Sequence, residues 1–182
     1  MNKRTPAHLV LKSAVLFLSL LCFYPLSATN PQKKEMKELN VKKVSLANVA
    51  VENVPALLDK EKVDFQSINT VNWKAFPYQP EVQFRIAHTD GAILIHYKVK
   101  EASVRAVATG DNGAVWEDAC VEFFSIPAGD GTYYNVECNC VGTLLIGAGG
   151  GRSNREHAPQ EVMDKVQRWS SLGRESFEER VG

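Results

Sequence analysis

Two β-strand candidates joined by a turn constrain the fold of this chain more than any other feature. The segments Val115–Phe124 (VWEDACVEFF) and Tyr133–Thr143 (YYNVECNCVGT) are short and rich in valine, aromatic residues and cysteine. Residues of these types favour strands, and the stretch Pro127–Thr132 between them has the glycine and aspartate content of a turn. The pair is therefore predicted to form an antiparallel hairpin.

Polar residues lie inside both predicted strands. Because side chains alternate between the two faces of a strand, Asn135, Glu137 and Asn139 share one face of the second strand. If the hairpin forms, Glu122 of the first strand can lie on this same face. A sheet face of carboxylates and amides, with Trp116 at its rim, is a plausible place to hold a hydroxyl-rich ligand.

Other segments extend the β pattern. Val82–His88 and Ile93–Val99 both alternate, and the Asp-Gly pair in Thr89–Gly91 between them is a strong hairpin signal. Weaker strand candidates are Leu39–Ser45 and Val104–Ala108. The glycine-rich stretch 147–152 is interpreted as a flexible turn, because it lacks the last glycine and the helix of a dinucleotide-binding loop.

Helical signals are few. Asn53–Asp59 is predicted to be a helical turn, and Val162, Val166 and Trp169 have helical spacing behind Pro159. The polar residues 170–182 follow without a closing strand. The predicted fold class is therefore mainly β: an antiparallel β-sandwich, immunoglobulin-like or jelly-roll-like, with one or two short helices.

The N-terminus has the layout of a secretory signal peptide. Lys3, Arg4 and Lys12 precede the apolar run Ala14–Phe23, and a small-residue cleavage site follows at Ala28. Residues 1–28 are therefore predicted to direct export to the periplasm or the cell exterior. The apolar run is shorter than a typical membrane-spanning helix, so no stable span is expected after cleavage.

The remaining chain divides into a polar lead-in, residues 29–38, and one domain, residues 39–182. Cleavage removes three cations and no acid, which leaves 18 basic and 21 acidic residues, a net charge of −3. Because no basic stripe remains, nucleic acid is excluded as an expected partner.

Three cysteines remain after cleavage: Cys120, Cys138 and Cys140. Their odd number permits one disulfide and one free thiol, although small buried thiols are the preferred interpretation. A metal site that combines them with His157 is disfavoured, because the C-x-C has no second pair at ligand spacing.

The glutamates of the polar face allow a catalytic alternative. Glycoside hydrolysis needs two acids that flank one bond, and Glu122 and Glu137 are candidates for such a pair. Glutamates on a binding face, or glutamates paired with Arg85 or Arg105, explain them equally well. A haem site is a further alternative, for which the candidate ligands are His88, His96, His157 and Met163, although no C-x-x-C-H motif occurs.

Several of these segments, in their order along the chain, carry a family resemblance. NWKAFPYQPEVQFRIAHTDGAILIHYKV, VRAV, DNGAVWEDACVEFF and YYNVECNCVGTLL together resemble the carbohydrate-binding family 9-like domain of exported bacterial proteins. This domain is related to the family 9 carbohydrate-binding modules of xylanases and, more distantly, to DOMON domains. The resemblance runs from about Leu39 to the end of the chain, and its most specific part is the W-x-D-x-C-V-E-F-F and Y-Y-N-x-E-x-N block.

The resemblance implies a β-sandwich that binds oligo- or polysaccharides and is associated with carbohydrate catabolism and glycoside hydrolases. Family 9 modules hold a sugar between aromatic walls, with polar side chains on its hydroxyls. Trp116 matches the first wall and Glu122 a sugar-bonding acid. The weaker ligand-binding candidates are Arg105, Asn135, Glu137 and Asn139.

The resemblance also implies, for some members, a structural calcium, which Asp111, Asp118 or Asp130 could serve. The chain is expected to be non-catalytic by itself; the alternative is a glycoside hydrolase or an accessory part of one. The family domain normally continues with further strands and a second aromatic wall, so this chain is expected to be truncated at its C-terminus.

Overall fold

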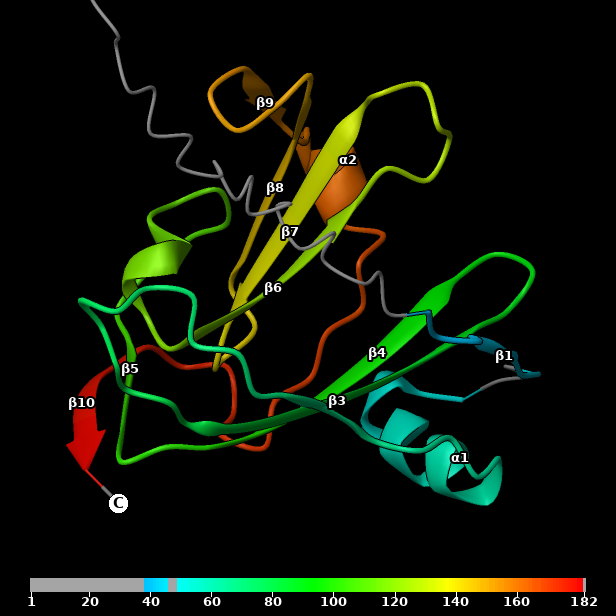
Figure 1. Ribbon diagram of the computed structural model, residues 1–182, viewed down its shortest axis with the longest axis horizontal. Coiled ribbons are helices and arrows are strands. Elements are labelled where there is room, and N and C mark those ends of the chain that lie inside the picture. The colour runs from blue at the N-terminus through cyan, green and yellow to red at the C-terminus, as the bar shows by residue number, and fades with distance from the viewer. Residues whose placement is uncertain (1–37, 46–48, 182) are drawn as a thin grey trace, which may run out of the picture. The chain divides into compact units, whose positions relative to one another are not determined.

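The computed structural model describes residues 38–45 and 49–181, and the predicted signal peptide and most of the polar lead-in lie outside them. The chain divides into two units between Glu38 and Leu39, and every strand and helix described below lies in the second. Figure 1 shows that this unit consists mainly of strands, with two short α-helices. The predicted mainly β, sandwich-type fold class is confirmed.

Strand β3 (Glu81–His88) is the centre of the first sheet. It pairs along its whole length with β4 (Ile93–Lys100), which confirms the predicted hairpin. At its other edge it pairs antiparallel with β2 (Gln66–Ile68) and parallel with β1 (Lys42–Lys43). The strand predicted over residues 39–45 is therefore reduced to two residues.

One hydrophobic cluster holds α1 (Val54–Lys60) against this sheet. The helix follows the 3-10 turn η1 (Val51–Asn53) and has Pro55 in its first turn, where proline is tolerated because no intrahelical N–H bond is lost. The buried residues of this hydrophobic cluster are Val54 and Leu58 of the helix, together with Val44, Ala87 and Leu94. The helical turn predicted over residues 53–59 is confirmed.

The sheet that carries the polar strands has the order β6 (Cys120–Ser125), β7 (Tyr133–Asn139), β8 (Leu144–Gly149) and β9 (Arg155–His157), all antiparallel. A short helix, α2 (Gln160–Met163), packs against one face of this sheet. The helix and the sheet share a second hydrophobic cluster, in which Leu144, Ile146 and Met163 are buried.

Strands β5 (Ser103–Ala106) and β10 (Phe177–Val181) form a separate antiparallel pair. The Ala119 amide donates to the Arg105 carbonyl at 2.9 Å, which links this pair to the chain just before β6. The expectation that residues 170–182 contain no closing strand is wrong. Their charged sequence lacks the apolar alternation of a strand, yet pairing with β5 supplies the hydrogen bonds.

Three further expectations need correction. The first part of the predicted strand 115–124 is the 3-10 turn η2 (Val115–Glu117), so only residues from Cys120 onward form a strand. The glycine-rich stretch begins inside β8, and its turn starts only after Gly149. In the predicted C-terminal helix, Met163 and not Val162 or Trp169 is buried, because the helix ends after one turn.

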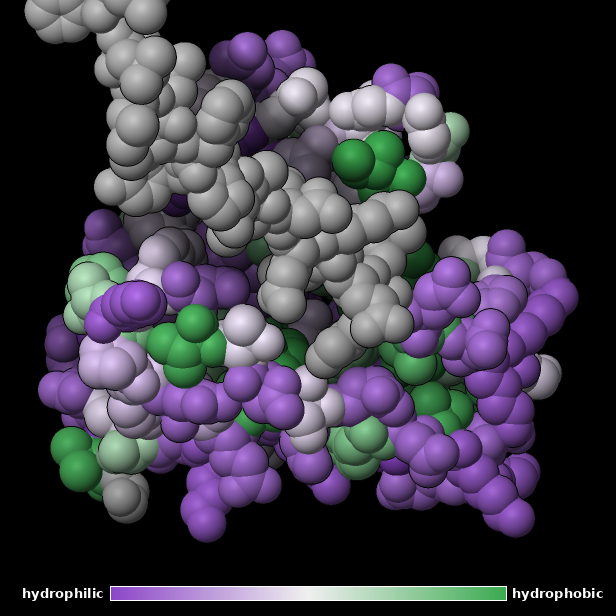
Figure 2. Space-filling view, in the orientation of Figure 1, coloured by the Kyte–Doolittle hydropathy of each residue, from purple (hydrophilic) through white to green (hydrophobic). Residues whose placement is uncertain are grey.

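Hydropathy varies over the surface. On the face shown in Figure 2, hydrophobic residues form separate patches between hydrophilic ones, outside the area that grey atoms cover. Among the large apolar side chains left exposed are three aromatic ones before β3, namely Trp73, Phe76 and Tyr78.

Candidate functional site

The register of β6 and β7 places the polar residues on one face, as predicted. Glu122 lies directly opposite Glu137, and Asn139 lies opposite Cys120. Asn135, two residues from Glu137, faces the same side. The shared polar face is therefore confirmed, whereas the contacts of these residues with a ligand stay a prediction.

Strand β7 buries its polar side chains more deeply than its apolar ones. Asn135, Glu137 and Asn139 are 1%, 5% and 3% exposed, whereas the intervening Val136 and Cys138 are only half-buried. Burying a carboxylate or an amide costs free energy unless it is hydrogen-bonded. This arrangement therefore needs either internal partners for each polar atom or a ligand that supplies them.

Some of these atoms have internal partners and some do not. The Asn135 side-chain amide donates to Glu137 Oε1 at 2.5 Å. Within residues 38–45 and 49–181, three buried side-chain atoms have no hydrogen-bond partner: Asn135 Oδ1, Glu137 Oε2 and Arg155 Nη1. Two acceptors and one donor are thus left available on one side of the sheet.

The turn that precedes β6 is held in place by Asp118. One of its carboxylate oxygens accepts from the Val107 amide at 2.9 Å; the other accepts from the Ala108 amide and from the side chain of Asn139. Burial raises the pKa of Asp118, but the hydrogen bonds outweigh that effect, so the pKa lies below its ordinary value. Asp118 thereby fixes the end of the turn that carries the aromatic rim residue.

Within this turn, neighbouring residues point in opposite directions. Val115 is fully buried, whereas the next residue, Trp116, is 57% exposed. An indole ring with this much exposed surface contributes little to the core and is available to a ligand. The predicted position of Trp116 at the rim of the polar face is correct, although a 3-10 turn and not a strand carries it.

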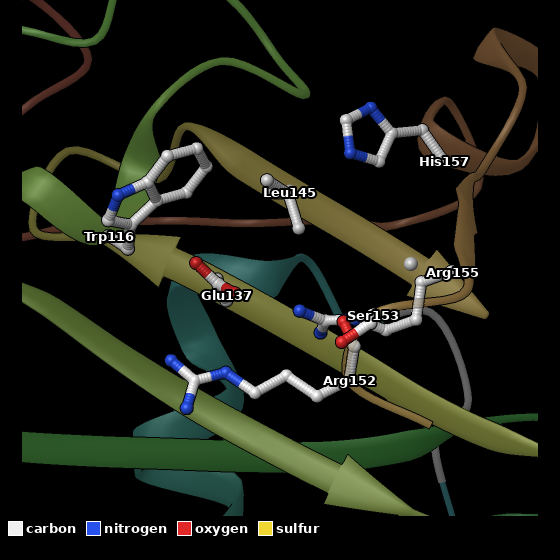
Figure 3. Close-up of a pocket in the computed structure, with 8 residues that line it drawn as sticks. Trp116, Glu137, Leu145, Arg152, Ser153, Arg155 and His157 are labelled. Atoms are coloured by element: carbon white, nitrogen blue, oxygen red, sulfur yellow. Dashed lines mark hydrogen bonds between the residues drawn. The ribbon is translucent and has the colours of Figure 1, made fainter. Parts of the chain in front are cut away.

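A cavity of about 240 Å³ lies over this face. Figure 3 shows Trp116 on one side of it, His157 on the other and Glu137 between them. Leu145, which lies opposite Glu137 on β8, supplies an apolar part of the lining. The complete lining is Trp116, Glu137, Leu145, Gly147, Arg152, Ser153, Arg155 and His157.

Sequence reasoning missed the cationic part of this lining. Arg152 follows β8 in the turn, and Arg155 begins β9. Their side chains extend over the sheet toward Glu137 (Figure 3). The absence of a side chain at Gly147 favours the position of Arg155, since a Cβ there would lie only 3.3 Å from the Arg155 Cβ. The sequence signal was the glycine-rich stretch next to two arginines, which was interpreted only as a turn.

The opposed glutamates influence one another. Partial desolvation raises the pKa of Glu122, and the charge of Glu137 raises it further, while Arg155 and Arg152 act in the other direction. Burial, with both glutamates nearby, raises the pKa of the Cys120 thiol to about 12. Potential ligand atoms of Cys120, Glu122 and Glu137 lie within 4.8 Å of one another, so these three are the residues that could hold a metal ion here.

Four of the six predicted ligand-binding residues lie outside the cavity lining. The side-chain oxygen Oδ1 of Asn139 accepts from the backbone amides of Val141 and Thr143, so this side chain closes the turn after β7. Arg105 lies on β5 and donates to the Glu117 carbonyl at 3.5 Å. Glu122 and Asn135 belong to the polar face next to the lining.

The proposed partners of the glutamates are engaged elsewhere. Buried Arg85 donates to Asp59 at 2.6 Å and to His96 Nδ1 at 3.1 Å. Neither Arg85 nor Arg105 forms an ion pair with Glu122 or Glu137 among the described residues.

The three aspartates considered for calcium do not fit a shared site. Asp111 is bonded bidentately by Arg168 and also by the Leu144 amide, Asp118 has the partners given above, and Asp130 accepts from the Thr132 amide. These carboxylates already face N–H donors, and at Asp111 a guanidinium occupies the place that a cation would take. The structural calcium stays a prediction without a ligand set.

The cysteines and the haem candidates have ordinary surroundings. All three described cysteines are free thiols. Met163 is fully buried in the α2 cluster, and His96 Nδ1 accepts a hydrogen bond from Arg85. Of the four residues considered as haem ligands, only His157 lines the cavity.

Comparison with known proteins identifies the family of this chain. The model of carbohydrate-binding family 9 matches residues 52–182. The chain is also similar to a "putative carbohydrate-binding protein" from Bacteroides uniformis ATCC 8492 with a crystal structure, at 61% sequence identity and a TM-score of 0.75. That alignment covers 79% of this chain and 66% of the other, so the chain spans slightly less than two thirds of that protein's length. No curated protein matches the chain.

Proposed function

The chain belongs to carbohydrate-binding family 9, and we propose that it is an exported domain that binds a sugar in the cavity beside Trp116. The proposal includes a role in polysaccharide recognition during carbohydrate catabolism. Family membership and the described relative support the ligand class. The basic N-terminus, the apolar run 14–23 and the cleavage site at Ala28 support export.

One observation carries the proposal: buried polar atoms without partners lie beside an exposed indole ring. Glu137 Oε2 and Asn135 Oδ1 are acceptors, and Arg155 Nη1 is a donor. A sugar ring presents hydroxyl groups, which both donate and accept, around its edge, and C–H groups on its faces. The hydroxyls would satisfy the buried atoms, while the C–H face would pack on Trp116.

The size of the cavity favours a small ligand unit. About 240 Å³ lies below the roughly 300–1,000 Å³ that is common for pockets of drug-sized ligands. One sugar ring is therefore the expected occupant of the enclosed part, with any further units of an oligosaccharide lying in solvent beyond it.

Isothermal titration calorimetry with xylo-, gluco- and manno-oligosaccharides tests the proposal. Trp116→Ala is expected to weaken the binding of the preferred sugar by about 2 kcal/mol, which is a factor of about 30 in Kd. Trp73→Ala is the matched control, because Trp73 is 68% exposed but does not line the cavity. Absence of binding to every sugar, or equal effects of the two substitutions, would contradict the proposal.

The same oligosaccharides distinguish sugar binding from the alternative, glycoside hydrolysis. Glu122 and Glu137 lie opposite each other on neighbouring strands, with carboxylate oxygens within 4.8 Å of one another. The two acids of glycoside hydrolases are separated by roughly 5–5.5 Å or more, so that they flank the bond that is cleaved. The binding proposal therefore predicts no release of reducing ends from the bound oligosaccharides. Release that disappears in Glu122→Gln would favour the hydrolase instead.

Export is tested separately. Mass spectrometry of the protein recovered outside the cytoplasm of the producing cell is expected to give a chain that begins at Thr29. An intact Met1 in that fraction, or retention of the whole chain in the cytoplasm, would contradict cleavage at Ala28.

A further inference from the structure

The cavity contains more positive charge than its own carboxylate balances. Arg152 and Arg155 both line it, against the single carboxylate of Glu137. Glu122 lies on the polar face just outside the lining. Among the described residues, neither guanidinium lies within 4.0 Å of a carboxylate oxygen.

The protein itself holds Arg155 in position. Its Nε donates to the Arg152 carbonyl at 3.3 Å, and its guanidinium lies 5.8 Å from the centre of the Tyr133 ring. Gly147 leaves room for its side chain, as described above. Within this arrangement Nη1 is buried and has no partner, so the NH₂ group at Nη1 of a fixed cation is left for a ligand.

Neutralisation of the glutamates does not explain this geometry. Arginines that serve mainly to balance Glu122 and Glu137 would form direct, preferably bidentate, ion pairs with them. Here Glu137 Oε2 and Arg155 Nη1 both stay unpaired around a cavity. The arrangement instead separates acceptors on the sheet from donors on the arginines.

This separation matches a ligand with two kinds of group. Hydroxyls can donate to Glu137 Oε2 and Asn135 Oδ1, whereas an anionic group is the strongest acceptor that guanidinium donors can bind. The Trp116 ring is available to the C–H face of the same ligand. A neutral sugar would use the acceptors and the ring, but would offer the two guanidinium groups no anionic acceptor.

We propose that the cavity selects an acidic sugar unit, with its carboxylate or sulfate ester bound by Arg152 and Arg155 and its hydroxyls bound by Glu137 and Asn135. This inference rests on the proposed carbohydrate-binding function. It goes beyond that function because it names the chemical class of the sugar.

Calorimetry with matched ligands tests the charge. Glucose, galactose and mannose are compared with the corresponding uronic acids and with the methyl esters of these acids, which keep the shape but lose the charge. At least one uronate is expected to bind about tenfold or more tightly than its ester and its parent sugar, since charge-assisted hydrogen bonds are about twice as strong as neutral ones. The 6-sulfates of the same sugars then distinguish a sulfate site from a carboxylate site.

Two variants test whether Arg152 and Arg155 cause the preference for an anionic sugar. Arg152→Gln and Arg155→Gln are each expected to abolish the preference for the anion while binding of the neutral sugar persists. Arg152 is exposed, so its replacement leaves the fold intact even if that of Arg155 does not. Arg180→Gln is the control, because Arg180 lies on β10 and faces Phe177 outside the cavity lining.

The outcomes separate the two proposals. Neutral sugars that bind as tightly as every acidic one would overturn the acidic-sugar inference and leave the proposed function standing. An anion preference that survives in both arginine variants would overturn the inference as well. If no sugar of any series binds, both proposals fail.

Discussion

Asp118 offers a test of how the site turn is built, because its carboxylate accepts three hydrogen bonds. The change Asp118→Asn keeps the size of the side chain but replaces one acceptor oxygen by an NH₂ group. Whichever way the amide is oriented, at least one of the donors from Val107, Ala108 and Asn139 then faces another donor.

The expected cost follows from these contacts. Leaving one partly buried N–H without an acceptor costs about 1–3 kcal/mol, and the remaining bonds weaken because the acceptor is no longer charged. We therefore expect Asp118→Asn to lower the free energy of unfolding by about 2–3 kcal/mol, which corresponds to a decrease in Tm of about 5–10 °C for a chain of this length.

Thermal and urea denaturation measure this change, and Asp130→Asn is the matched control. Asp130 is an aspartate in the turn between β6 and β7, and it has a single partner, the Thr132 amide. Its replacement is expected to cost about 0.5 kcal/mol or less, as for most surface positions. Equal losses in the two variants would refute the role given to Asp118.

The pH dependence gives a second check on Asp118. Because its pKa is lowered in the folded protein, its charge stabilises the fold above the pKa of the unfolded chain, and this contribution is lost as the pH falls through the folded pKa. The stability difference between wild type and Asp118→Asn is therefore expected to shrink in acid. A difference that stays constant between neutral and acidic pH would contradict the proposed hydrogen bonds.

Three further predictions concern other parts of the structure. A Cβ at Gly149 would lie 1.8 Å from a backbone carbonyl oxygen, so Gly149→Ala is expected to lower the free energy of unfolding by about 1–3 kcal/mol or more. Denaturation of Gly151→Ala is the control, because no atom lies within 4 Å of a Cβ at Gly151. Burial lowers the pKa of His96, so stability is expected to fall as the pH drops below about 6.5, and urea denaturation should show this loss reduced in His96→Gln. Replacing Glu137 by Gln is expected to lower the pKa of Glu122 in an NMR titration, because a neighbouring negative charge is removed; an unchanged value would contradict their interaction.

The face shared by the polar residues was predictable because strand periodicity is a local property. Once residues 133–139 form a strand, Asn135, Glu137 and Asn139 must lie on one side, and the short turn before them brings Glu122 opposite. The pattern alone could not distinguish the 3-10 turn at Val115–Glu117 from a strand. That turn depends on Asp118, which accepts from amides about ten residues earlier in the chain.

The cationic half of the candidate site was not predictable from local patterns. Arg152 and Arg155 reach the face because the turn after β8 leads into β9, which pairs with β8 at the edge of the same sheet. The missing side chain at Gly147 gives the Arg155 side chain additional space. In the sequence these glycines resemble a flexible turn. Likewise, Asn139 has the residue type of a sugar ligand, but its side chain is used by the turn that follows its own strand.

The most direct test of the central claim is fluorescence from Trp116 alone. The chain has three tryptophans, so the double variant Trp73→Phe, Trp169→Phe leaves Trp116 as the sole emitter at the rim of the cavity. On titration with the preferred sugar, its emission is expected to change and to saturate at the Kd that calorimetry gives for the same variant. Binding by calorimetry without any change in Trp116 emission would place the sugar elsewhere and contradict the account.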